Sequence, residues 1–170
     1  ASYRLILPRI WTEVLVDNIT VPGQSKGPAP DYLERHRLFV RKLEINSDNL
    51  GNYNFIFPNL HTLALGSDSQ TERGISSVGD VTSLVFLNSS LVHLRLHRLD
   101  GYLVAGFWKA VADLPHLRSL HIFGATMTNA RDVEPFWSLC TKLESIHMAA
   151  TTIATCDSKL ANLLFPNTQS

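Results

Sequence analysis

The residues of this chain best suited to chemistry are four histidines and one arginine in its second half. His93 and His97 flank Arg95, and His121 and His147 follow further along. An imidazole can bind a metal ion, transfer a proton or donate a hydrogen bond, and a guanidinium group binds carboxylates and phosphates. Which of these applies depends on the element that carries each residue. His93 and His97 would share one face of a helix, but on a strand they lie about 13 Å apart, too far for one ion.

The elements are set by an internal repeat. Five segments share the apolar spacing L-x-x-L-x-L with conservative replacements, over residues 40–45, 60–65, 91–96, 117–122 and 143–148, and a weaker copy covers residues 11–16. The middle apolar residues of the six copies are Val14, Leu43, Leu63, Leu94, Leu120 and Ile146, which gives gaps of 29, 20, 31, 26 and 26. Leucine-rich repeats run at roughly 20–29 residues, so the spacing fits them with one long insertion. Most of the 25 leucines belong to this pattern or to the helices between its copies.

Each copy ends in an alternating stretch that predicts a short strand with one buried face. The segments between copies carry apolar residues at helical spacing. We expect helices over residues 32–38, from about 78 to 85 behind a capping box of Ser77 and Asp80, and over 103–114, with two more after Asn129 and Asp157. The segment 46–57 is too short for a turn and a helix, so a loop or a single helical turn is expected there.

The expected fold is an α/β leucine-rich-repeat solenoid, or horseshoe, with a concave parallel sheet and convex helices. One strand–helix unit cannot bury its apolar face alone, but stacked units can. A doubly wound sheet would need longer apolar strands and a glycine-rich phosphate turn, and the sequence contains neither. Residues 1–170 are interpreted as one domain of about six repeats, truncated at both ends, with a flexible Pro/Gly-rich loop over residues 18–31.

With these residues in view, the chain resembles fungal F-box and leucine-rich-repeat proteins of the ribonuclease-inhibitor-like superfamily. The resemblance rests on the repeat over residues 39–148, on the Pro8-Arg9-Ile10-Trp11 opening and on the segments 32–36 and 40–43. In such proteins a Pro-x-x-Trp stretch often marks the end of the F-box and the start of the repeats. The resemblance implies that the repeats select a substrate for ubiquitin ligation, and that the ligase adaptor binds only through an F-box, which these residues lack. The alternative is a stand-alone intracellular repeat protein that acts as a scaffold or regulator without a ligase link.

In this architecture the strand residues between the leucines face the concave side. The residues predicted to bind a protein partner there are Lys42, Glu44, His93, Arg95, His97, His121, Phe123 and His147. Neighbouring strands lie about 4.8 Å apart, so Arg95, His121 and His147 should form one row, with His97 and Phe123 adjacent in the next. Arginine and aromatic residues are favoured interface anchors, and several histidines would make binding sensitive to pH near about 6. The alternative is an ordinary solvated face with a chance excess of histidine.

Charge is distributed unevenly along the predicted face. The first two strands carry Glu13, Asp17 and Glu44 against Lys42, whereas the last three carry Arg95 and the four histidines without an acidic residue. The whole chain has fifteen basic and fifteen acidic residues, which argues against a generally basic nucleic-acid binder but not against a locally basic face.

Other classes of function find little support in the sequence. No catalytic or metal-binding motif occurs, so we expect no enzymatic activity, no metal and no cofactor. No apolar run approaches the ~20 residues of a membrane helix. Cys140 and Cys156 do not form a disulfide framework, so we expect an intracellular protein of the cytoplasm or nucleus. Asn-x-Ser/Thr triplets at Asn18 and Asn88 are of a kind that often arises by chance.

The tryptophans are interpreted as packing residues. Trp108 and Trp137 each follow a phenylalanine on consecutive predicted helices, where large aromatic side chains fill the gaps between repeats. A second, aromatic binding surface is the alternative for this pair. Trp11 is expected to cap the start of the array or to contact a module upstream of it.

Overall fold

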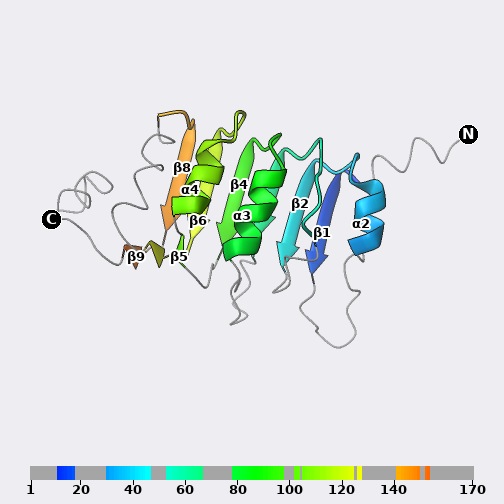
Figure 1. The fold of residues 1–170 in the computed structure, drawn as a ribbon, viewed down its shortest axis with the longest axis horizontal. Helices are drawn as coiled ribbons and strands as arrows, with labels where there is room; N and C mark the ends of the chain where they lie inside the picture. The colour runs from blue at the N-terminus through cyan, green and yellow to red at the C-terminus, as the bar shows by residue number, and fades with distance from the viewer. Residues whose placement is uncertain are drawn as a thin grey trace, which may run out of the picture.

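A six-stranded parallel sheet, in which the strands follow one another in sequence order, organises the molecule. The computed structural model describes residues 11–17, 30–46, 53–66, 78–97, 102–103, 105–124, 126–127, 141–149 and 152–153. The six strands are β1 (Glu13–Asp17), β2 (Lys42–Asn46), β3 (Thr62–Leu65), β4 (His93–His97), β6 (Ser119–Phe123) and β8 (Ser145–Ala149). Figure 1 shows them side by side, from β1 near the N-terminal end to β8. Each copy of the sequence repeat therefore contributes one strand, as predicted.

The strands pair so that equivalent repeat positions lie opposite each other. The middle apolar residues form a continuous line across the sheet, through Val14, Leu43, Leu63, Leu94, Leu120 and Ile146. A shift by one residue would turn every apolar side chain of a strand to the other face of the sheet. The repeat spacing thus fixes the register of the whole sheet.

Three described helices lie on the same side of the sheet: α2 (Pro30–His36), α3 (Val78–Leu87) and α4 (Ala105–Ala112) (Figure 1). They correspond to the first three predicted helices. The start of α2 includes the last two residues of the segment 18–31 that was expected to be a loop; residues 18–29 lie outside the described residues. The helices expected after Asn129 and Asp157 also lie outside them. None of the described helices has the length and apolar character that crossing a bilayer requires.

The prediction that the third helix begins at residue 103 was wrong. Tyr102–Leu103 forms the short strand β5, and α4 begins only at Ala105. β5 pairs with β7 (Thr126–Met127), which pairs with β9 (Thr152–Ile153), in a second parallel sheet beyond the arrowheads of the large one (Figure 1). Main-chain pairing with the next repeat makes this segment a strand. The spacing of apolar residues does not reveal that pairing.

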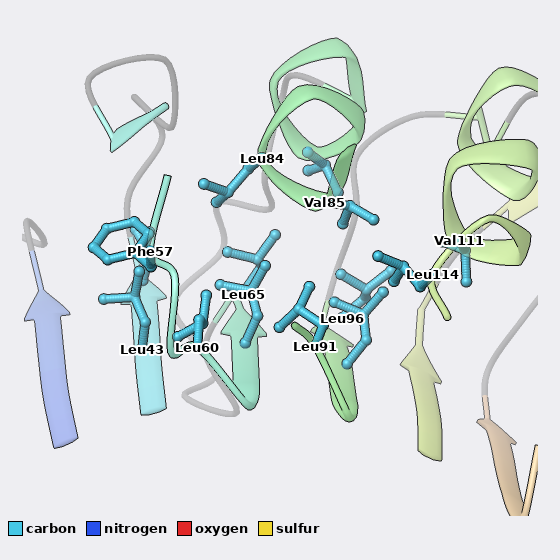
Figure 2. Close-up of a cluster of buried hydrophobic side chains, with 14 of the residues drawn as sticks. Leu43, Phe57, Leu60, Leu65, Leu84, Val85, Leu91, Leu96, Val111 and Leu114 are labelled. Atoms are coloured by element: carbon cyan, nitrogen blue, oxygen red, sulfur yellow. The ribbon is translucent and has the colours of Figure 1, made fainter. Parts of the chain in front are cut away.

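The hydrophobic core lies between the large sheet and the helices. Strand leucines such as Leu65 and Leu96 point toward Leu84 and Val85 of α3, as Figure 2 shows. Phe57, in the irregular segment between β2 and β3, joins the same core. All five of these side chains are fully buried. The repeated leucines thus contact their equivalents in the neighbouring repeats and form one core.

Trp108 is part of this core, which supports its assignment as a packing residue. Its side chain is fully buried, and its ring lies edge-on to Phe107 with 5.0 Å between the centroids. Trp11 is partly buried and stacks on His36 of α2 at 4.2 Å, with the ring planes nearly parallel. Trp137 lies outside the described residues.

Asn88 is the only buried polar side chain in the described part of the chain. Its Oδ1 accepts the main-chain N–H of Phe57 at 2.7 Å, and its Nδ2 donates to the carbonyl oxygens of Leu84 at 2.7 Å and Phe55 at 3.2 Å. Buried main-chain groups need such partners, because leaving one unsatisfied costs about 1–3 kcal/mol. The residue noted in the sequence as part of an Asn-x-Ser triplet therefore ties the end of α3 to the segment before β3.

Candidate functional site

The face of the large sheet that points away from the described helices carries the candidate site. In β4, Leu94 and Leu96 are fully buried, whereas His93 and Arg95, which alternate with them, are exposed. We call this side the open face; its described side chains are Glu13, Leu15, Lys42, Glu44, Thr62, Ala64, His93, Arg95, His97, Ser119, His121, Phe123, Ser145, His147 and Ala149. Parallel sheets are usually covered on both faces, and their strands then read as continuous apolar runs. The alternation seen here instead suits a face that stays accessible.

The predicted rows of residues on the open face are present. Arg95 lies opposite His121, and His121 lies opposite His147, in the strand register. His97 lies opposite Phe123 in the next row. Six of the predicted binding residues therefore occupy three consecutive strands. We call this group the histidine–arginine patch: His93, Arg95, His97, His121, Phe123 and His147.

Ring contacts connect the residues of the patch, and the diagonal contact between His97 and His121 is one that sequence reasoning did not foresee. The His121 ring lies 4.4 Å from that of His147 and 5.4 Å from that of His97, measured between centroids. The His97 ring in turn lies 6.2 Å from that of Phe123. His121 is thus the centre of a continuous ring surface that extends over β4, β6 and β8.

The patch offers one permanent positive charge and several hydrogen-bond donors to solvent. His93, Arg95 and His147 are exposed, and His121 and His97 are half-buried. Phe123, at 37% exposure, adds an apolar edge. Among the described residues Arg95 makes no ion pair, in contrast to Lys42 and Arg118. Its guanidinium group is therefore available to a ligand.

The two remaining predicted residues, Lys42 and Glu44, lie on the open face but apart from the patch. Lys42 donates to Glu13 across β1 and β2 at 3.1 Å, in an ion pair exposed enough to contribute at most about 1 kcal/mol. Glu44 lies opposite Ala64, and Ala64 lies opposite Arg95. The small side chains of β3 thus separate an acidic part of the face from the histidine–arginine patch. The side chain of Asp17 lies outside the described residues.

Gly66, directly after β3, contributes to this separation. Its φ of 84° favours glycine, and its N–H donates to the carbonyl oxygen of Ile45 at 3.0 Å. A Cβ added here would overlap the main-chain carbonyl oxygen of His97. No other residue type fits between β2 and β4 without a shift of the main chain. His97 therefore has a glycine on one side and Phe123 on the other.

Within the described ranges, no group of three or more His, Cys, Asp or Glu side chains is arranged to hold a metal ion. Ser119 and His121 lie two residues apart on the same face of β6, and Ser145 and His147 do so on β8.

One ion pair near the patch was not predicted from the sequence. Arg118 and Glu144 precede β6 and β8 and form a salt bridge at 3.3 Å. Both residues follow the first leucine of their repeat, so opposite charges at this position of adjacent copies were the available signal.

A shallow hollow elsewhere on the surface is a weaker candidate. It has a volume of about 480 Å³ and is formed by α2 and the turn after it. Its walls are Asp31, Glu34, Arg35, Arg37 and Leu38. Two acidic and two basic side chains give it no preference for either sign of charge.

Comparison with known proteins identifies no relative of this chain. A scan against family models found no match, and searches of curated proteins and of solved structures also found no similar protein.

Proposed function

We propose that the chain is a leucine-rich-repeat solenoid whose open face, its concave side, recognises another protein. The observation that carries the proposal is the histidine–arginine patch, which crosses three consecutive strands on the face away from the described helices. Arginine and aromatic side chains dominate the energetic centres of protein interfaces. A rigid, in-register sheet also presents these groups at little cost in conformational entropy, which favours binding.

The resemblance to F-box and leucine-rich-repeat proteins supports a more specific role. In this proposal the repeats select a substrate protein for ubiquitin ligation, and an F-box, not the repeats, binds the ligase adaptor. The chain itself performs no chemistry and needs no cofactor. The repeat pattern and the Pro8-x-x-Trp11 opening are the features that support the link. If the full-length chain binds no ligase adaptor, the role becomes that of an intracellular scaffold or regulator.

Affinity capture with the full-length chain tests the proposal. Wild-type chain is compared with the double variant Arg95→Ala/His121→Ala, and captured proteins are identified by mass spectrometry. Specific partners should bind the double variant at least about tenfold more weakly, a loss of about 1.4 kcal/mol. Both side chains point away from the core, so the melting temperature should stay close to that of wild type.

A matched control removes a cation on the helix side of the molecule. Lys109 is exposed on α4, and Lys109→Ala changes the net charge as Arg95→Ala does. This variant should capture the same partners as wild type. Equal capture by the wild type, the double variant and the control would contradict recognition by the open face.

A further inference from the structure

We infer that the segment bound by the histidine–arginine patch is acidic, with Asp or Glu side chains lying over β4, β6 and β8. This inference rests on the proposed function and specifies the chemistry of the partner. It follows from the charges on the patch, from the ring contacts at its centre and from the opposite charge of the neighbouring strands.

The patch contains donors and lacks carboxylates. On β4, β6 and β8 the described open-face side chains include one arginine and four histidines, and none is Asp or Glu. A carboxylate has only acceptor oxygens, so its recognition needs a surface rich in N–H donors. Guanidinium binds carboxylates through two parallel hydrogen bonds, and charge-assisted bonds of this kind are about twice as strong as neutral ones.

Among the described residues of the open face, no acidic side chain pairs with Arg95. Glu13 is paired with Lys42, and Glu44 is two strands away from Arg95, on β2. Ala64 is the open-face neighbour of Arg95 on β3. An incoming carboxylate therefore displaces no ion pair between Arg95 and another described residue.

The ring surface beside Arg95 extends the recognition over two further strands. His121 lies opposite Arg95 and contacts the rings of both His97 and His147. A neutral imidazole has one N–H donor and a protonated one has two, so these rings bind carboxylates in either state. Phe123, beside His97, offers an apolar contact to a side chain between the acidic ones.

The rest of the open face limits the extent and direction of the acidic segment. On β1 and β2 its described charged side chains are Glu13, Glu44 and Lys42. Like charges brought together across an interface oppose binding and select against the wrong orientation. The acidic segment should therefore lie over β4–β8 and end before β2. A nucleic acid, whose backbone is negative throughout, fits this divided face less well than a short acidic peptide.

Nuclear magnetic resonance of the histidine side chains in the full chain tests the inference. The probes are a dodecapeptide of alternating Glu and Ser and its Gln/Ser counterpart. The Glu peptide should shift the imidazole signals of His93, His97, His121 and His147. His36, His61 and His116 lie outside the patch and serve as internal controls that should not move. The Gln peptide should give shifts at least about tenfold smaller at equal concentration.

Two substitutions that change the charge by the same amount test where the peptide binds. Arg95→Glu should abolish the shifts, whereas Lys109→Glu on the helix side should leave them unchanged. Equal effects of the two variants, equal shifts from the Glu and Gln peptides, or no shift at millimolar peptide would each overturn the inference. Tighter, Arg95-dependent binding of single-stranded DNA than of the Glu peptide would also overturn it.

Failure of this inference is distinguishable from failure of the proposed function. A captured partner that requires Arg95 and His121, but whose binding is insensitive to salt between 50 and 300 mM, would leave protein recognition intact and remove the acidic segment. Capture that is indifferent to both residues would contradict the proposed function itself.

Discussion

Single side chains on this molecule divide clearly between structure and recognition. Asn88 is buried and makes three hydrogen bonds to main-chain groups, whereas Arg95 is exposed and makes no ion pair among the described residues. A substitution at the first position should therefore affect stability, and one at the second should affect binding.

Asn88→Ala should lower the free energy of unfolding by about 3 kcal/mol. The change leaves the Phe57 N–H and the carbonyl oxygens of Phe55 and Leu84 without their side-chain partner, and unsatisfied buried groups cost about 1–3 kcal/mol each. Urea denaturation followed by circular dichroism measures the loss.

Asn59→Ala is the matched control, because Asn59 donates one bond to the Leu38 carbonyl oxygen from an exposed position. It should cost less than about 1 kcal/mol. Similar losses for the two variants would show that burial of the Asn88 amide is not what makes it important.

At the scale of elements, the approach of neighbouring strands sets the shape of the open face. Ala64 and Gly66 have little or no side chain, so the β3 part of this face projects less than its neighbours. It separates the ion pair of β1 and β2 from the rings of β4, β6 and β8. The short second sheet, β5–β7–β9, ties the repeats together at the carboxyl ends of the strands (Figure 1). Contacts between strands thus hold neighbouring repeats together and divide the open face into two differently charged parts.

Gly66→Ala should destabilise the fold by more than about 2 kcal/mol. The positive φ is unfavourable for alanine, and the new Cβ would overlap the His97 carbonyl oxygen, so β3 and β4 must move apart. Thermal and urea unfolding measure the effect.

Gly106→Ala provides the opposite expectation. Gly106 lies in α4, and a Cβ added there meets no atom within 4 Å. Alanine should stabilise the helix by up to about 1 kcal/mol. The close approach of β3 and β4 at Gly66 would be refuted if both variants were equally stable.

At the scale of the whole molecule, the repeats share one core. The described core residues, from Val14 of β1 to Ile122 of β6, belong to a single cluster of buried side chains. The leucines of each repeat pack in one cluster with those of its neighbours, so loss of one repeat exposes the next.

The described repeats should therefore unfold in a single transition. Trp11 packs at the β1 end of the core and Trp108 lies within α4, so they report on distant parts of the array. With 5-fluorotryptophan in place of tryptophan, the 19F signals of both residues should disappear over the same range of urea concentration. Trp→Phe variants assign the signals. Loss of the Trp11 signal at a distinctly lower concentration would show that the repeats unfold separately.

The repeat spacing alone is enough to predict the positions of the six strands of the large sheet, their parallel order and the rows of the candidate site. A repeat of apolar residues at fixed spacing leaves one register in which all leucines are buried, so the same spacing also aligns Arg95, His121 and His147. The existence of the first three helices is also predictable, because their apolar periodicity differs from that of the strands, but the start of α4 is not.

Other features depend on contacts between repeats and emerge only when the chain is folded. The β5 strand, the Asn88 hydrogen bonds, the overlap at Gly66 and the diagonal contact of His121 with His97 join positions that no local pattern relates. Local spacing determines which face a side chain is on, whereas the packing of neighbouring strands determines what it touches there.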